Sequence, residues 1–349
     1  MDEDLRSRDF VNQGDESEQV KKKRIRKTIG EEGNRKQTLI GLLVTVGLGL
    51  AFYLPPQIKQ WWQGMDLNIN LGKESEVIRI EKPVGDKKNV SEVVGFKVEI
   101  KQKEDAETVV KQMLGDLAGS YGLYVEKLAG GEKFGINEGE VFTAASVIKL
   151  PILVVYYQAV DKNQLDPKTK YVLAEEDRLV YGTGSMQNQP NGTKFSYQRI
   201  ALLAANESDN MAAELLIKFL GGETKVQAKL TALGLKDTKI KENKTTPKEI
   251  ADLLKRIYQG GLLSQNSREE LMDNLTKTIL EDRITAGVPS NIKVIHKFGS
   301  EGGVVNDCGI VEAKNPYTIC VLSTGVNDGE AMELLPKISR VIWEWGSRD

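Results

Sequence analysis

The spacing of hydrophobic residues divides the second half of the chain into regular elements. Recurrence every three to four residues is typical of an amphipathic helix, and strict alternation is typical of a half-buried strand. Helical spacing predicts helices over residues 105–117, 147–160, 197–204, 210–219, 247–258, 269–278 and 332–345. The alternating pattern predicts strands over residues 121–128, 132–136, 304–312 and 317–324.

The order of these elements predicts the fold class. A helix and two strands come first, a block of helices follows, and two strands and a helix end the chain. This order is typical of an antiparallel sheet with helices from both chain ends on one face. We therefore expect residues 105–349 to form one α/β domain of the layered α+β type, with a helical subdomain beside the sheet.

An uncharged segment over residues 37–58 precedes this domain and contains an apolar run over residues 39–54. A helix that spans a bilayer needs about 20 predominantly apolar residues, so this segment is long enough to cross. Trp61 and Trp62 follow it, at the place where tryptophans anchor a helix at the membrane surface. The pattern predicts a single transmembrane helix over residues 37–58.

The flanks of this segment predict its orientation. Residues 1–36 are rich in lysine and arginine, with four of these cations in a row at Lys21-Lys22-Lys23-Arg24. Under the positive-inside rule this tail lies in the cytoplasm. Residues 59–104 then form a stalk or linker, and the domain at residues 105–349 lies outside the cytoplasm on a single-pass anchor in the cell membrane.

Composition excludes several classes of function. The net charge of −2 gives no support for a nucleic acid partner. The chain has one histidine, His296, so metal clusters built from several histidines are excluded, and its two cysteines are too few for a zinc site. We expect neither a metal nor a cofactor.

Ser146 and Lys149 form a Ser-x-x-Lys pair at the start of an apolar helix. Residues i and i+3 share a helix face, so the lysine amine can lie beside the serine hydroxyl. The amides of a helix N-terminus favour negative charge there, and a lysine can act as a base when burial or another cation lowers its pKa. Ser290 and Lys293 repeat the pattern in a loop-like stretch after Pro289, and that copy is set aside.

A second motif, Ser208-Asp209-Asn210, lies between two predicted helices. Its serine offers a hydroxyl that can relay a proton to a leaving group, and Asn210 offers an amide that can hold a substrate carbonyl. Asp209 is expected to be structural.

A third motif, His296-Lys297-Phe298-Gly299-Ser300, lies at the start of the C-terminal strand pair. Lys297 supplies a cation that can bind a substrate carboxylate and help to lower the pKa of Lys149. Gly299 lets a substrate backbone approach the strand. The backbone amide of Ser300 can complete an oxyanion hole with the amide of Ser146.

Together the three motifs resemble Ser-x-x-Lys, Ser-Asp-Asn and Lys-Thr-Gly of class A β-lactamases and penicillin-binding proteins, in the same chain order. The resemblance covers residues 105–349 and implies a β-lactamase/transpeptidase-like fold with a serine acyl-enzyme mechanism. It implies that Ser146 is the nucleophile, Lys149 a base and Ser208 a proton relay. The other residues that it carries over are Lys297 on the side of the substrate carboxylate, and Asn210, Gly299 and Ser300 as substrate contacts.

The sequence departs from this family at two places. Phe298 stands where the third motif has a small hydroxyl residue, which removes one hydrogen bond. Class A β-lactamases also carry a glutamate in a Glu-x-x-Leu-Asn loop before a Thr-Thr-Pro helix, and here residues 240–244 run straight into Thr245-Thr246-Pro247. Glu242 is the one nearby carboxylate, and we do not expect it to replace the missing glutamate.

Three functions are compatible with these motifs. The first is a β-lactamase-like serine hydrolase that hydrolyses a β-lactam amide and deacylates slowly. The second is a penicillin-binding-protein-like D-Ala-D-Ala peptidase that acts on stem peptides of the cell wall. The third is a degenerate domain that binds cell-wall peptides without turnover.

The two cysteines are predicted to face each other. Cys308 and Cys320 each lie six residues from Lys314, the midpoint of the predicted C-terminal hairpin, which makes them neighbours across the strands. A disulfide and a pair of buried thiols both fit this placement.

Overall fold

The computed structural model describes residues 102–115, 117–180, 182–276 and 278–347. No helix within these ranges is long and apolar enough to cross a membrane. The predicted cytoplasmic tail, the predicted transmembrane helix and nearly all of the predicted linker lie outside the described residues. Their placement and the orientation of the chain remain predictions.

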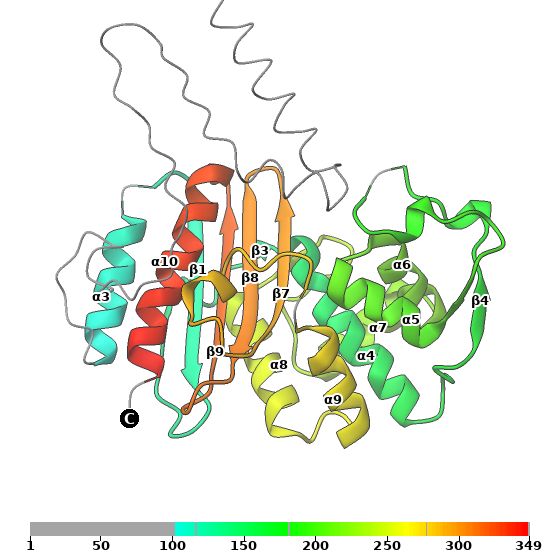
Figure 1. Cartoon of the computed structure of the whole chain (residues 1–349), viewed down its shortest axis with the longest axis horizontal. Helices are drawn as coiled ribbons and strands as arrows, with labels where there is room; N and C mark the ends of the chain where they lie inside the picture. Colours follow the sequence, from blue (N-terminus) through cyan, green and yellow to red (C-terminus); the bar gives the residue numbers. More distant parts are fainter. Residues whose placement is uncertain (1–101, 116, 181, 277, 348–349) are drawn as a thin grey trace, which may run out of the picture. The chain divides into compact units, whose positions relative to one another are not determined.

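One antiparallel sheet of five strands runs through the domain in the order β2-β1-β9-β8-β7 (Figure 1). The strands are β1 (Ser120–Lys127), β2 (Lys133–Ile136), β7 (Val294–Glu301), β8 (Val304–Val311) and β9 (Tyr317–Thr324). The predicted antiparallel sheet is confirmed. The third motif lies within β7, which is an edge strand of this sheet.

Helices from both ends of the described chain pack together on one face of the sheet (Figure 1). They are α3 (Lys103–Leu114) and α10 (Asp328–Gly346). Alternate strand residues such as Leu123 and Val321 join Val110 and Ile342 of these helices in one buried cluster. The prediction that both terminal helices cover the same face is confirmed. Successive side chains of a strand point to opposite faces of the sheet, so every second residue is directed toward these two helices.

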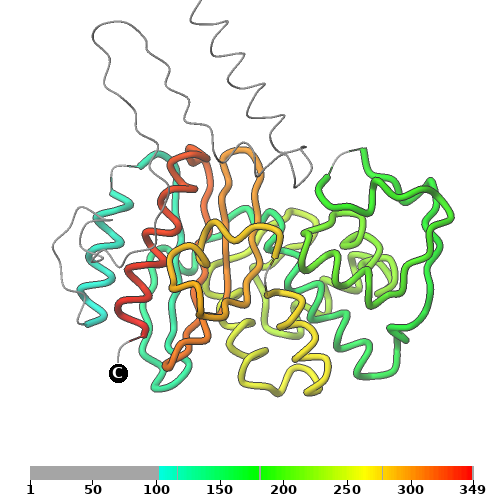
Figure 2. The backbone as a smooth tube through the Cα atoms, in the orientation of Figure 1, coloured from blue at the N-terminus to red at the C-terminus, as the bar shows by residue number. Residues whose placement is uncertain are grey.

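The middle of the chain forms a helical region against the other face, as the green and yellow segments of Figure 2 show. Its helices are α4 (Lys149–Asp161), α5 (Tyr197–Leu202), α6 (Asn210–Phe219), α7 (Glu223–Ala232), α8 (Pro247–Gln259) and α9 (Gln265–Asn274). Two short ladders complete it: β3 (Phe142–Thr143) with β6 (Lys244–Thr245), and β4 (Lys170–Val172) with β5 (Lys194–Ser196).

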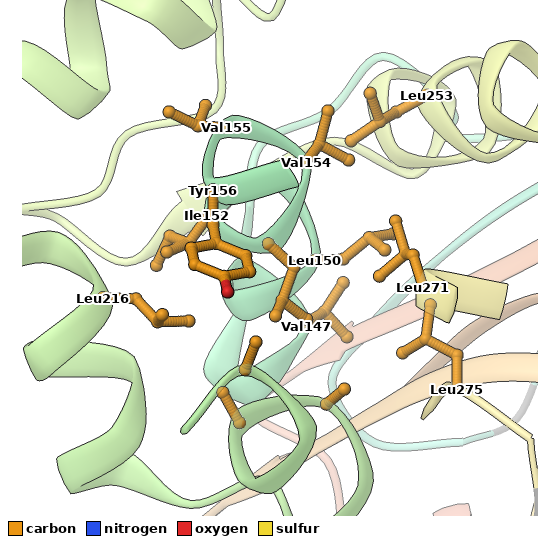
Figure 3. Close-up of a cluster of buried hydrophobic side chains, with 14 of the residues drawn as sticks. Val147, Leu150, Ile152, Val154, Val155, Tyr156, Leu216, Leu253, Leu271 and Leu275 are labelled. Atoms are coloured by element: carbon orange, nitrogen blue, oxygen red, sulfur yellow. The ribbon is translucent and has the colours of Figure 1, made fainter. Parts of the chain in front are cut away.

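The helix α4 forms the centre of this region. It follows directly on the 3₁₀ turn η2 (Ala145–Ile148), and side chains such as Leu150, Val154 and Tyr156 project from it in several directions into the surrounding core (Figure 3). A helix that is apolar all round is a buried helix. Packing on several sides fixes the first turn of α4 and with it the neighbouring Ser146.

The helices α7 and α9 are examples of differences from the prediction. The helix α7 was not predicted, because Val226 and Leu230 alone among its residues are buried and so give a weak period. The helix α9 begins at Gln265, where the side chain of Ser264 accepts a hydrogen bond from the backbone amide of Ser267, and it ends before the predicted end. It ends there because Thr276 forms an isolated bridge to Ile295 on β7.

Cys308 on β8 and Cys320 on β9 are directly opposite each other in the strand register and are fully buried. The predicted proximity is therefore confirmed. The structure joins the two residues by a disulfide bond, which resolves the choice that the sequence left open.

Candidate active site

The segment that carries Ser146 is held by two neighbouring strands. Asn306 on β8 donates its side-chain amide to the carbonyls of Thr143 (2.8 Å) and Ala144 (3.1 Å). Gly299 on β7 comes so close that a Cβ atom at this position would lie 2.8 Å from the Ser146 nitrogen. A side chain there would push the strand away from the serine, so this contact requires glycine.

The lysine of the first motif lies beside the serine. Lys149 Nζ donates to Ser146 Oγ at 2.8 Å, to Asn210 Oδ1 at 2.6 Å and to the Ser208 carbonyl at 2.5 Å. The Lys149 side chain is 5% exposed. The amine is therefore held by oxygen atoms of the first and second motifs, among them the hydroxyl of Ser146.

Ser208 connects the first motif to the third. Its hydroxyl accepts from Lys297 Nζ at 2.9 Å and from Lys149 Nζ at 3.2 Å. Both Ser208 and Lys297 are buried, and Lys297 Nζ also donates to the Phe298 carbonyl at 3.0 Å. A hydroxyl that contacts two lysine amines is well placed to pass a proton between them.

Both lysines have lowered pKa values. Burial lowers the pKa of Lys149 to about 8, although the Asp209 and Glu214 carboxylates oppose this shift. Burial also lowers the pKa of Lys297, and the nearby charge of Lys149 lowers it further. We expected Lys297 to help lower the pKa of Lys149, but burial is the cause there.

Ala145, which precedes Ser146, and Ser208 have a left-handed backbone without being glycine, with φ 45° and φ 57°. Such a conformation costs about 1–3 kcal/mol and persists where the surroundings hold it. The Ser208 carbonyl accepts from Thr183 Oγ1 at 2.9 Å, and the Asp209 amide donates back to the Leu203 carbonyl. The strain lies next to Ser146 and at the bridging serine.

Asp209 has the structural role that its position predicts. It caps α6, where Oδ1 accepts from the Ala212 amide at 2.9 Å, and Oδ2 accepts from the Met186 amide at 2.7 Å. Gly184, with φ 107°, leaves room for this carboxylate, because a Cβ atom there would lie 2.1 Å from Asp209 Oδ2. The capped turn fixes Ser208 on one side and Asn210 on the other.

Phe298 has two basic side chains near its ring. The Lys297 amine lies 4.1 Å from the centre of its ring, and the Arg283 guanidinium lies 5.7 Å away. The missing hydroxyl of the third motif is thus replaced by an aromatic face, which stabilises nearby positive charge.

An open cleft of about 790 Å³ gives access to this group. Its lining includes Ser146, Lys149, Asn210, Glu214, Ile240 and Ser300. Ser208 and Lys297 lie buried behind it. The structure thus collects the predicted residues from η2, α4, the start of α6 and β7 around one opening to solvent.

Comparison with known proteins agrees with this geometry. The model of the β-lactamase enzyme family matches residues 105–345. The chain belongs to this family. The β-lactamase VEB-1 of Pseudomonas aeruginosa is 26% identical over 238 residues, which cover 60% of this chain and 80% of the relative. A β-lactamase of Amycolatopsis lactamdurans is 26% identical over 221 residues, 58% of this chain and 72% of the relative.

Solved structures support the same relationship. The structure of PBP-A has a TM-score of 0.65 and 27% identity, and the match covers 70% of this chain and 96% of PBP-A. An ancestral class A β-lactamase, at 23% identity and a TM-score of 0.64, shows the same fold. Membership of the β-lactamase enzyme family supports a serine hydrolase at the level of its general chemistry.

Arg283 is a site residue that the sequence did not reveal. It is buried, and its Nη1 donates to the carbonyls of Gly299 (3.1 Å) and Asn306 (2.8 Å) while Nη2 donates to Ser300 Oγ (2.6 Å). In this member of the β-lactamase enzyme family, Arg283 therefore positions the end of β7. No local pattern marks it, because it lies in an irregular segment.

The carboxylates near the cleft also differ from expectation. Glu242, which the sequence placed nearest, is exposed and is not part of the lining of the cleft. Glu214 on α6 and Glu301 at the end of β7 do line it. Glu214 is four residues after Asn210, so helical spacing within the predicted helix was the signal available for finding it.

His296 forms a buried pair with Asp307, with its Nδ1 2.8 Å from Oδ1. Burial alone lowers the pKa of His296, but the Asp307 and Glu281 carboxylates outweigh it and raise the pKa from 6.5 to about 9. The charged pair therefore stabilises the fold fully below pH 6.5, and this contribution is lost as pH rises through about 9.

We expect the stability difference between the wild type and His296→Gln to depend on pH. It should shrink by roughly 3 kcal/mol between pH 6 and pH 10, since one pKa unit corresponds to about 1.4 kcal/mol. Urea unfolding of both proteins across this range measures it. A difference that stays constant with pH would show that His296 acts through packing alone.

Proposed function

We propose that this chain is a serine hydrolase of the β-lactamase type that forms an acyl-enzyme at Ser146 with a β-lactam. The observation that carries the proposal is the contact of Lys149 Nζ with Ser146 Oγ at 2.8 Å inside an open cleft. A lysine with a pKa of about 8 is neutral in roughly a tenth of molecules at pH 7, far more often than an ordinary lysine, so it can accept the proton of the serine.

The acylation step follows from these contacts. Neutral Lys149 takes the proton of Ser146 Oγ, and Oγ attacks the carbonyl carbon of the β-lactam. The amides of Ser146 and Ser300 stabilise the oxyanion. The carbon–nitrogen bond of the ring then breaks, and the nitrogen takes a proton from Ser208 Oγ, which takes one from the Lys149 ammonium.

Lys297 has a separate role in this scheme. Burial and the charge of Lys149 both lower the pKa of Lys297, and a neutral Lys149 removes the second of these causes, which favours the charged form of Lys297. A charged amine on β7 suits a substrate carboxylate, and Asn210 and the edge of β7 then orient the substrate amide.

The names of the relatives support β-lactams as the substrate class, because VEB-1 and the Amycolatopsis protein are β-lactamases. A PBP-A variant has also been solved as an acyl-enzyme complex with penicillin G. Neither alternative function is favoured by these relatives. Release of D-Ala from a stem-peptide analogue without β-lactam cleavage would favour the peptidase, and binding without an adduct would favour the degenerate domain.

The acyl-enzyme is expected to decay slowly. The loop that would carry a dedicated glutamate is short: the Ala144 amide donates to the Asn243 carbonyl at 2.8 Å, and Lys244 and Thr245 pair with β3. This loop therefore holds no glutamate beside the ester, so deacylation should be slower than acylation and should limit the rate of turnover.

The experiment is intact-mass analysis of a soluble domain that begins before α3, mixed with a penicillin and sampled over time. We expect rapid gain of one penicillin mass, followed by slow return to the free mass. Return within the same time as the gain would contradict slow decay. Absence of any adduct and of any hydrolysis would contradict the proposed function.

A further inference from the structure

We propose that Glu214 is the general base that activates the deacylating water in this enzyme. The inference rests on the proposed acyl-enzyme at Ser146 and concerns the second half of that reaction. It assigns activation of the water to a residue on a helix, because this chain lacks the loop glutamate of class A β-lactamases.

The position of Glu214 carries the inference. Asn210, Ala213, Glu214 and Ile217 recur at i, i+3, i+4 and i+7 along α6, and all four line the cleft with Ser146. The helix is fixed at this end, because Asp209 caps it and Asn210 Oδ1 accepts from Lys149 Nζ. Glu214 therefore projects from one helical turn beyond a residue that contacts the catalytic lysine.

The short loop leaves this part of the cleft open to Glu214. The loop is tied on both sides, by the Ile240 amide donating to Gln227 Oε1 at 2.9 Å and by Thr238 Oγ1 in contact with Thr245 Oγ1 at 2.7 Å. It places Ile240 in the lining of the cleft and leaves Glu242 outside that lining. The acid nearest in sequence to the motif is therefore not the one that lines the site.

The carboxylate of Glu214 is free to act on water. Among the described residues, none forms a hydrogen bond or an ion pair with it, and the residue remains exposed to the solvent of the cleft. Although the residue is exposed, its neighbours keep part of the carboxylate away from water; this and the charge of Glu223 raise its pKa, while Lys149 opposes the shift. A raised pKa makes a carboxylate a stronger base. The other charged groups in this lining are Arg178, Lys241 and Glu301.

The step balances as follows. Glu214 takes one proton of a water molecule, and the water oxygen forms a bond to the carbonyl carbon of the Ser146 ester. The bond from that carbon to Oγ breaks. The proton on Glu214 passes through solvent to Lys149, which acylation left neutral, and Lys149 passes it to Oγ. Both groups are then restored, and the product leaves as an acid.

The test compares Glu214→Gln with the matched control Glu242→Gln in the soluble domain, using penicillin G and intact-mass analysis. We expect both variants to acylate within about threefold of the wild type. The acyl-enzyme of Glu214→Gln should decay at least about 100-fold more slowly, whereas that of Glu242→Gln should decay like the wild type.

Two further readouts separate a base from a structural residue. Decay of the wild-type adduct should accelerate with pH until Glu214 is ionised, and Glu214→Gln should lose that dependence. Hydroxylamine, which needs no general base, should release the acyl group from both proteins at similar rates. Equal decay of the wild type and Glu214→Gln would overturn this inference and leave the acyl-enzyme intact, whereas a wild type that forms no adduct would overturn both proposals.

Discussion

Ser146→Ala should form no covalent adduct with penicillin, while the domain remains folded. Lys149 Nζ contacts the hydroxyl oxygen of Ser146 at 2.8 Å. Among the described residues that line this cleft, no other hydroxyl group contacts a lysine of the lining. Removing one hydroxyl from a turn costs little packing, so the unfolding transition should shift by a few degrees at most. Intact-mass analysis after prolonged incubation gives the result.

A suitable control is Ser290→Ala, which alters the serine of the second Ser-x-x-Lys pattern. Ser290 lies in the loop before β7, away from α4, so this variant should be labelled like the wild type. An adduct on Ser146→Ala would mean that another residue is the nucleophile, and peptide mapping of that adduct would identify it.

The sequence predicted those parts of the site that are marked by short local patterns. Ser146 and Lys149 lie within one turn, and Ser208 and Asn210 lie within three residues, so each pair could be recognised without knowing the fold. The third motif could be assigned to the same site only because the three motifs occur in the same order in class A β-lactamases and penicillin-binding proteins. The structure adds the distances, above all the two lysine amines on the Ser208 hydroxyl.

Residues that act through long-range contacts could not be predicted in this way. Arg283 is an isolated cation in an irregular segment, and its role arises from contacts with Gly299, Ser300 and Asn306, which belong to two strands further along the chain. Glu214 looks like an ordinary polar residue of an amphipathic helix. Its place in the cleft depends on the shortness of a loop that follows some 25 residues later, which is a feature of the fold as a whole.

The fold shows the same division. The strands around Cys308 and Cys320 were predicted because alternation and a central turn fix their register, and both cysteines are opposite each other. The helix α7 was not predicted because its hydrophobic face is narrow, with Val226 and Leu230 as its buried residues. The spacing of hydrophobic residues identifies a helix or strand when one of its faces is largely buried. It fails for a helix such as α7 that buries few side chains.

Lys149→Met should reduce the rate of acylation by about 10²–10⁴-fold, the usual contribution of a general base. Methionine approximates the length and the apolar stem of lysine, so the buried helix start keeps most of its packing. The variant lacks the amine that contacts Ser146 Oγ and Ser208 Oγ, so neither the attack of Ser146 nor the proton relay through Ser208 is assisted. Mass analysis of samples quenched at set times after mixing with penicillin measures the acylation rate, and thermal unfolding measures the stability of the variant.

The pH dependence separates a base from a fixed cation. Neutral Lys149 is the active form, so the wild-type acylation rate should rise with pH and level off above about 8. Lys149→Arg keeps a charge that does not ionise in this range, so it should be as slow as Lys149→Met and lack the rise. If Lys149→Arg acylated like the wild type with the same pH profile, Lys149 would be acting through its charge, and the base would have to be sought elsewhere in the cleft.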